Sequence, residues 1–240
     1  TKNFSWNTTL NLAHNKNEVT RLSNDQFTTD RIYAGDAWVR GGSGGTTHVV
    51  EEGYPIGQFF GWNCEGIVDG KYILTDINED GQISEDDRTY IGSAQPDLTF
   101  GWNNSFRYKN FDFSFFFRGS IGQKVMNHVR MAYAQSGGLI GANALNDPLT
   151  YELKEVPKYC SYYIEDASFV RLDNVTLGYT LPKSWMKAAK LGNVRVFASA
   201  DNIALFTHLK GMDPQYNFSG STDYAYSPNK TYSLGIEVNF

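Results

Sequence analysis

The sequence predicts an all-β fold: about six C-terminal antiparallel strands of a large transmembrane β-barrel with long extracellular loops. Three observations lead to this prediction. Aromatic residues make up 15% of the 240 residues, and long helical periodicity is almost absent. Apolar and polar residues alternate along six segments of about ten residues, long enough to cross a bilayer at a tilt of about 45°. Short connections between these segments alternate with long ones, as in outer-membrane barrels.

The alternation is clearest in the last segment, Thr231–Phe240. Successive side chains of a strand point to opposite sides. One face of this strand is therefore apolar, with Tyr232, Leu234, Ile236, Val238 and Phe240. The other face is small or polar, with Ser233, Gly235, Glu237 and Asn239. Such a strand fits a wall with lipid on one side and a polar lumen on the other.

Five earlier segments share the pattern: Lys2–Ala13, Leu98–Lys109, Phe111–Gly119, Ser168–Thr180 and Val194–Leu205. The apolar register changes within the fourth of them, which predicts a β-bulge near Asp173–Asn174. Asn104 is the one polar residue on the apolar face of its segment. Six charged residues fall on the polar faces, where we expect contact with water or with a plug: Arg107, Asp112, Arg118, Arg195, Asp201 and Glu237.

The connections give the strands a direction. Lys109–Asn110 is a minimal turn, and residues 182–192 are a short connection with one helical turn, whereas residues 14–97, 121–167 and 211–230 are long. Periplasmic turns of such barrels are short and extracellular loops are long. The last strand therefore runs inward to end at Phe240, and parity makes Lys2–Ala13 run outward.

Aromatic residues gather near the predicted periplasmic end, where they would form a girdle at the membrane interface. They are Phe4, Tyr108, Tyr179, Trp185 and Phe240. The strand-like segment Tyr54–Gly66 falls within the long loop 14–97, and we place it there as a hairpin with Lys71–Leu74. A soluble β-sandwich remains the alternative, although its strands are usually only roughly 5–6 residues long.

Other classes of protein find little support in the sequence. The net charge is −5, and no basic stripe indicates nucleic-acid binding. No apolar run reaches the length of a transmembrane helix. The histidines are scattered and no enzyme motif occurs, so we expect no catalysis.

Cys64 and Cys160 lie 96 positions apart, either as a disulfide or as two free thiols. The chain starts at Thr1 inside a strand-like segment, so we expect the preceding part to be missing.

One chemical motif stands out, at Asp76–Asp87 (DINEDGQISEDD). It follows the calcium-loop spacing, which wraps six to eight oxygens around one hard cation. Gly81 permits the sharp turn at position 6. The ligands predicted for Ca²⁺ are Asp76, Asn78, Asp80, Gln82 through its carbonyl, Ser84 and Asp87. No strong helical pattern flanks the loop, which favours a structural site; an exposed acidic turn is the alternative.

Several stretches resemble the C-terminal part of SusC/RagA-type TonB-dependent outer-membrane transporters of Bacteroidetes. They lie in order along the chain and include DINEDGQISEDDRTYIGSAQPDLTFGWNNSFRYKNFDFSFFFRGSIG (76–122), SFVRLDNVTLGYTLPKSW (168–185), NVRVFASADNIALFT (193–207) and KTYSLGIEVNF (230–240). The combination is far more specific than any one stretch, and together these stretches span nearly the whole chain.

The resemblance implies that residues 1–240 are the last six strands of a barrel of about 22 strands. The plug and the N-terminal part, which contacts TonB, would be absent. The implied function is energy-coupled uptake of glycan or peptide fragments through the outer membrane, with a SusD-like surface lipoprotein as a lid. The terminal Phe240 resembles the signal that the barrel-assembly machinery reads. The alternatives are a calcium-dependent surface binding module and a soluble β-sandwich without transport activity.

Overall fold

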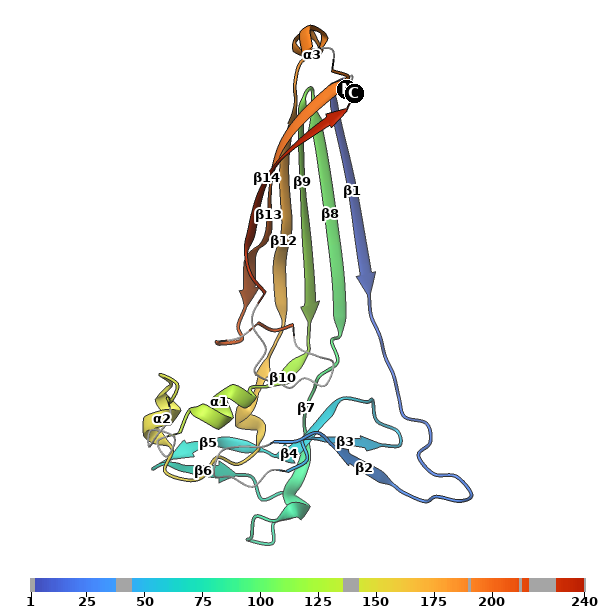
Figure 1. The fold of residues 1–240 in the computed structure, drawn as a ribbon. Coiled ribbons are helices and arrows are strands. Elements are labelled where there is room, and N and C mark those ends of the chain that lie inside the picture. Colours follow the sequence, from blue (N-terminus) through green and yellow to red (C-terminus); the bar gives the residue numbers. More distant parts are fainter. Residues whose placement is uncertain are drawn as a thin grey trace.

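The computed structural model describes residues 3–37, 45–135, 143–189, 191–211, 213–215 and 228–239. A tall, gently curved sheet stands on a smaller mixed region, and the first described strand begins and the last one ends at the top of the sheet (Figure 1). We call the tall sheet the wall. The mixed region, residues 31–93 and 124–166, is called the lobe.

The wall has six strands, as the sequence predicted. They are β1 (Phe4–Ala13), β8 (Leu98–Tyr108), β9 (Phe111–Ile121), β12 (Phe169–Thr180), β13 (Asn193–Thr207) and β14 (Thr231–Asn239). The spatial order is β1-β8-β9-β12-β13-β14, and every neighbouring pair is antiparallel. Strands of 9 to 15 residues and their alternating direction agree with the predicted membrane crossings.

Local features of the wall also follow the sequence. The register of β12 shifts between Leu172 and Asn174, which confirms the predicted bulge. Lys109 adopts a φ of 53°, the left-handed conformation that a two-residue hairpin turn requires. The short connection after β12 contains the helix α3 (Lys183–Ala189), at the top of the wall in Figure 1.

One face of the wall exposes large apolar side chains. On β14, Leu234 is 87% exposed, and Tyr232 and Ile236 lie beside it on the same face. Leu10 and Leu12 on β1 are also exposed. Isolated apolar residues on a soluble surface are ordinary, but a continuous apolar sheet face indicates contact with lipid or a partner.

An aromatic row crosses this face near α3. The strand register places Phe4 beside Tyr108, Tyr108 beside Phe111, and Phe111 beside Tyr179. The rings of Phe111 and Tyr179 are 4.6 Å apart. Phe4, Tyr108 and Tyr179 of the predicted girdle therefore share one level, as an interfacial girdle requires. Trp185 lies in the helix that follows β12, and Phe240 lies outside the described residues.

The lobe consists of small sheets and short helices. Strands β2 (Arg31–Ala34), β3 (His48–Glu51), β4 (Gln58–Trp62) and β7 (Arg88–Ser93) form one sheet, and β5 (Cys64–Val68) pairs with β6 (Lys71–Leu74). A third pair joins β10 (Lys124–Met126) to β11 (Ile164–Asp166). Helices α1 (His128–Tyr133) and α2 (Pro148–Glu152) and the 3₁₀ turns η1 (Glu85–Asp87) and η3 (Ser161–Tyr163) complete it.

The predicted hairpin in the lobe was wrong in its first half. Only Cys64–Val68 pairs with Lys71–Leu74. The preceding Gln58–Trp62 pairs instead with β3 and β7. Phe59 and Phe60 on this strand are buried, so burial of two adjacent aromatic side chains on both faces favours the inner position that β4 takes.

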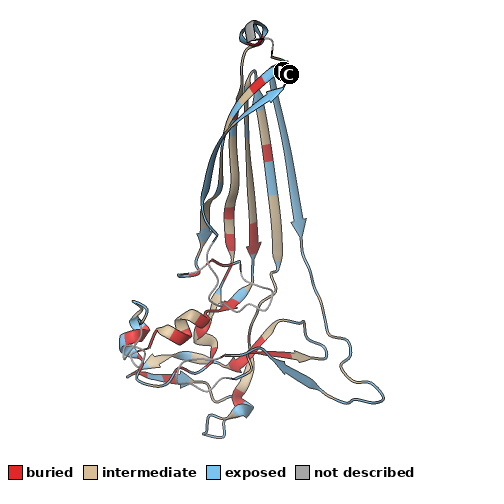
Figure 2. Cartoon of the chain, viewed as in Figure 1, coloured by how far each residue is buried: buried red, intermediate tan, exposed pale blue. Residues whose placement is uncertain are grey.

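The apolar core of the described residues lies mainly in the lobe (Figure 2). It brings β4 and β5 together with α1, α2 and η3, and its fully buried members include Phe59, Met131, Leu149, Cys160 and Tyr163. These residues come from both sides of the β8–β9 hairpin. The lobe is therefore one packed body made from two separate stretches of chain. Among the described residues, no helix has both the length and the apolar character to span a membrane.

Candidate functional site

The polar face of the wall carries paired charges. Near α3, Arg195 holds Asp112 through two hydrogen bonds, of 2.9 and 2.6 Å, and Glu237 lies 3.8 Å from the same guanidinium. Arg107 lies directly across from Asp112. The charges that the sequence assigned to this face therefore largely neutralise one another across neighbouring strands.

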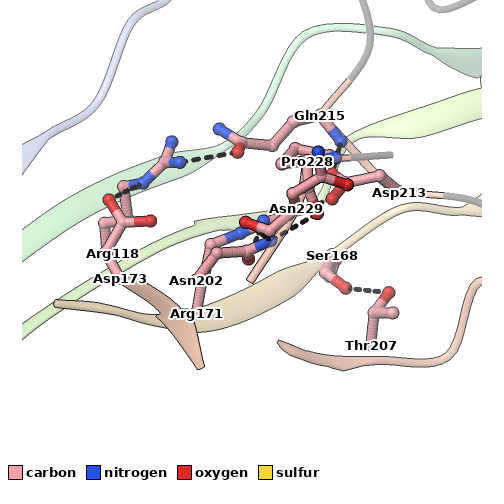
Figure 3. Close-up of polar contacts among 10 residues, drawn as sticks. All are labelled: Arg118, Ser168, Arg171, Asp173, Asn202, Thr207, Asp213, Gln215, Pro228 and Asn229. Carbon is pink, nitrogen blue, oxygen red and sulfur yellow. Dashed lines mark hydrogen bonds and ion pairs between the residues drawn. The ribbon is translucent and has the colours of Figure 1, made fainter. Parts of the chain in front are cut away.

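A second polar cluster lies at the opposite end of this face (Figure 3). Arg118 on β9 pairs with Asp173 at the β12 bulge at 2.5 Å and donates to Gln215 at 2.7 Å. The bulge thus gives the extra residue whose carboxylate reaches the neighbouring strand. Arg118 consequently links two wall strands to the segment that follows β13.

Arg171 is the buried centre of this cluster. Its side chain is 1% exposed and pairs with Asp213, whose side chain is 8% exposed. It also donates to Asn202, whose φ of 52° marks an irregular position within β13. Asn202 in turn donates to the carbonyl of Pro228 at 2.7 Å. Asp213 and Pro228, in the described parts of the last long loop, are therefore held against the wall by these contacts.

A cleft of about 340 Å³ lies beside this cluster. Polar groups at its edge come from Arg118, Gln123 and Gln215, and the rings of Phe100 and Phe169 form its apolar side. A cleft with few polar groups and a partly apolar lining suits a small part of a larger ligand.

Sequence reasoning missed Arg171, Asn202, Asp213 and Gln215. Arg171 lies between the apolar residues Val170 and Leu172, just before the predicted bulge, so the alternation there could have assigned it to the polar face. Asp213 and Gln215 lie in a loop with no periodic pattern. An Arg two residues before a predicted bulge in a transmembrane strand was the signal that could have identified this cluster.

The calcium-type loop adopts a compact turn within the lobe. Asp76 Oδ2 accepts from Gly81 N at 2.7 Å, and Asn78 Oδ1 accepts from Asp80 N at 3.0 Å. Asp80 Oδ1 accepts from Gln82 N at 2.8 Å. Gly81 has a φ of 84°, as its predicted role in the turn requires. These bonds orient the side chains at positions 1, 3 and 5 of the motif.

Asp87 closes the same loop. Its Oδ1 accepts from Ile77 N at 2.9 Å and its Oδ2 accepts from Ser84 N at 2.7 Å. The backbone N–H of Ser84, followed by those of Ile77 and Asn78, lowers the pKa of this carboxyl. Asp87 thus caps the short η1 turn. Within the described residues, no three His, Cys, Asp or Glu side chains converge as a preformed metal site.

One oxygen of the loop has no partner of its own. Asp76 Oδ1 is buried and receives no hydrogen bond from any described residue, although burial of an unpaired carboxylate oxygen is costly. Gln82 and Ser84 lie within the same turn, and Ser84 N–H bonds to Asp87. Phe240, the predicted assembly signal, lies outside the described residues.

Comparison with known proteins finds relatives of the chain over its whole length. No family model matches the chain. TonB-dependent receptor P3 of Formosa agariphila is 29% identical over 276 residues, and TonB-dependent receptor SusC of Bacteroides thetaiotaomicron is 31% identical over 251 residues. Each alignment covers 100% of this chain but only 27% and 25% of the relative. The chain thus spans about a quarter of the length of these curated relatives.

Solved structures agree with the sequence comparison. The RagAB peptide transporter matches 100% of this chain and 28% of its own chain, with a TM-score of 0.80 at 25% identity. The RagAB peptide importer in the "closed-closed" state gives a TM-score of 0.82 with the same coverage. The wall is accordingly a segment of an outer-membrane β-barrel.

The chain is recognised as the C-terminal part of a SusC/RagA-type TonB-dependent receptor, as the sequence predicted, and the protein is located in the outer membrane. The receptors and transporters that it resembles are not enzymes.

Proposed function

We propose that this chain is part of a TonB-dependent transporter that imports glycan or peptide fragments through the outer membrane. The observation that carries the proposal is the match of the whole chain, wall and lobe together, to a peptide transporter with a TM-score of 0.80. The apolar face of the wall would contact lipid, and the polar face would line the transport path. The two edges of the six-stranded sheet, β1 and β14, would pair with further strands of the barrel, because lipid cannot satisfy their backbone groups.

The lobe would stand at the extracellular mouth of this barrel. A SusD-like lipoprotein lid would rest near it, and TonB would act from the periplasm on the plug of the transporter. The cluster around Arg171 would hold the last loop against the mouth of the path. The relatives support this proposal through the names TonB-dependent receptor and peptide transporter.

An uptake experiment tests the proposal. A strain that lacks the protein would be supplied with labelled oligosaccharides and labelled oligopeptides, with the intact gene restored as the control. We expect uptake of one of these two classes only in the restored strain, and its loss when a protonophore removes the energy for TonB. Equal uptake of both pools in the two strains would refute the transport proposal. Deletion of a surface lipoprotein that co-purifies with the protein should lower uptake at limiting substrate concentrations.

We further propose that the loop Asp76–Asp87 binds Ca²⁺ as a structural ion. The unpartnered, buried Asp76 Oδ1 favours this site, because a cation would satisfy the carboxylate oxygen. Asn78 and Asp80 lie at the next ligand positions, and the carbonyl of Gln82, with Ser84 and Asp87, would complete the shell. Asp87 would have to release part of its bonds to backbone N–H groups.

Calorimetric titration of the detergent-solubilised protein with Ca²⁺ tests this site. Asp76→Asn and Asp80→Asn should lose the binding isotherm. Glu79→Gln serves as the matched control, because Glu79 lies in the same loop at position 4, which supplies no ligand in this motif. Binding that is unchanged in the Asp76→Asn and Asp80→Asn variants would eliminate the site while leaving the transport proposal intact.

A further inference from the structure

The two cysteines, 96 positions apart in the sequence, come together in the lobe. Cys160 is fully buried in the apolar core, and Cys64 is partly exposed and packs against that core. Both are free thiols in this structure. The two thiols lie in side-chain contact, and the Cys64 thiol also donates to the carbonyl oxygen of Gly66 at 3.3 Å.

Contacts of the surrounding residues fix the positions of the two cysteines. Trp62 and Cys160 form a parallel β-bridge, which aligns β4 with the chain before η3. Cys64 N donates to Ser161 Oγ at 2.8 Å, and Ser161 Oγ also bonds to Asn63 Oδ1 at 3.2 Å. Contacts on both sides of each cysteine therefore hold the two strand segments at a fixed distance, so the thiols need no loop movement to remain neighbours.

The two thiols differ in reactivity. The hydrogen bond from Cys160 lowers the pKa of Cys64 to about 7. The same contact and burial raise the pKa of Cys160. The other titratable groups that face the pair are Glu65, Lys158, Tyr72, Tyr159 and Tyr163. Burial is the largest cause that raises the pKa of all three phenols, so none of them ionises near neutral pH.

We propose that Cys64 and Cys160 are an oxidisable pair. They form a disulfide by exchange with an external disulfide, either that of a periplasmic thiol oxidase or glutathione disulfide. The Cys64 thiolate attacks one sulfur of the oxidant and displaces the other as a thiolate. The Cys160 thiol then gives its proton to the displaced thiolate, attacks the Cys64 sulfur of the mixed disulfide and releases the second oxidant sulfur as a thiolate, which takes a proton from water. The two protein thiols are oxidised, and one oxidant disulfide is reduced to two thiols.

This bond would join the two stretches of chain that build the lobe. Outer-membrane proteins cross the periplasm and face the exterior, both of which permit stable disulfides. A link between residues 64 and 160 would close a long loop of chain that contains the β8–β9 hairpin, which constrains the unfolded lobe strongly. The polar site and the transport activity do not enter the argument, so this proposal is independent of them.

Thiol counting on the protein as isolated tests the proposal. Cells would be lysed in a denaturant that contains a maleimide reagent, so that only free thiols are labelled. We expect no label on Cys64 or Cys160 in the native protein, label on both after reduction, and a Cys64–Cys160 cross-linked peptide by mass spectrometry. The reduced, folded protein treated with glutathione disulfide should regain the same cross-link. Label on both Cys64 and Cys160 in the native protein, with only a glutathione adduct after oxidation, would overturn the proposal.

Single substitutions distinguish Cys64, which attacks the oxidant, from Cys160, which resolves the mixed disulfide. With the Cys160→Ala variant, Cys64 should stop at the mixed disulfide with glutathione, and the pH at which its alkylation rate is half-maximal should rise above the value of about 7 set by the native pair. With the Cys64→Ala variant, the buried Cys160 should remain unmodified. An alkylation profile of Cys64 that is identical with and without Cys160 would also count against the pair.

Discussion

Arg171 shows how a single buried charge is accommodated at the end of the wall opposite α3. Its partner Asp213 comes from a loop rather than a strand, and both side chains are almost fully removed from solvent. Such a pair contributes little in net terms, because desolvation opposes the attraction. Removal of one partner is costly, however, because the other charge stays buried without compensation.

We therefore predict that Asp213→Ala destabilises the protein by about 3–5 kcal/mol, whereas Asp213→Asn, which keeps a hydrogen-bond acceptor, costs less. Urea unfolding of the protein in lipid vesicles would measure the difference. Glu85→Gln is the control, because the Glu85 side chain is 73% exposed in its pair with Arg88, and exposed pairs contribute about 0–1 kcal/mol. Equal effects of Asp213→Ala and Glu85→Gln would contradict the buried role of Asp213.

Asn104 is the polar exception on the apolar face, and Trp6 explains how it is tolerated. The Trp6 indole N–H donates to Asn104 Oδ1 at 3.0 Å, and Asn104 is only 1% exposed. The Trp6 ring also stacks on Phe106, with ring centres 5.9 Å apart. The Trp6 ring thus covers the amide and satisfies its oxygen, whereas the buried Asn104 Nδ2 has no hydrogen-bond partner among the described residues.

This contact predicts non-additive substitutions. Trp6→Phe keeps the ring but removes the donor, and should cost about 1–3 kcal/mol because Asn104 loses its partner. The double variant Trp6→Phe, Asn104→Leu removes both polar groups and should recover most of that loss. A double-mutant cycle from unfolding in vesicles measures the coupling. A double variant as unstable as the sum of the two single variants would disprove the coupling.

At the scale of elements, Gly119 sets the distance between β9 and its neighbours. A Cβ at this position would lie 2.3 Å from the Phe100 ring and 2.7 Å from the carbonyl oxygen of Phe169. The ring could rotate away, but the backbone oxygen belongs to β12 and cannot. The absence of a side chain therefore permits Phe100 to pack across the strand pair.

Gly119→Ala should consequently destabilise the wall by about 1–3 kcal/mol through overpacking. Gly45→Ala is the matched control, because a Cβ there would meet no atom of the described residues within 4 Å. The urea midpoints of the two variants, measured side by side in vesicles, would decide this. A Gly119→Ala protein as stable as the control would show that β12 can shift without cost.

The strands of the wall were predictable because each repeats one simple period over about ten residues. The bulge at Leu172–Asn174 was visible for the same reason, as a break in that period. The lobe was not predictable to the same degree, since Gln58–Trp62 and Cys64–Val68 join different sheets without a turn signal between them. The motif at Asp76–Asp87 predicted the turn that the loop adopts, but the spacing could not reveal that Asp87 bonds to backbone N–H groups.

At the scale of the whole molecule, the orientation of the wall can be tested with one pair of substitutions on β14. Leu234 lies on the apolar face, and Ser233 lies next to it on the polar face. An Arg in contact with lipid near the bilayer midplane costs about 2–4 kcal/mol, whereas the lumen tolerates charge. Leu234→Arg should therefore lower stability and insertion in vesicles, with Ser233→Arg nearly unaffected. A larger effect of Ser233→Arg would reverse the assignment of the two faces.

The construction of the lobe from two stretches on either side of the β8–β9 hairpin has a consequence for the order of assembly. The core contains Phe59 from before the hairpin and Tyr163 from after it. Both stretches must reach the same side of the membrane before this core can form. Once it has formed, the hairpin cannot slip back across the bilayer unless the lobe unfolds first. The lobe thus acts as a latch that makes insertion of these two strands hard to reverse.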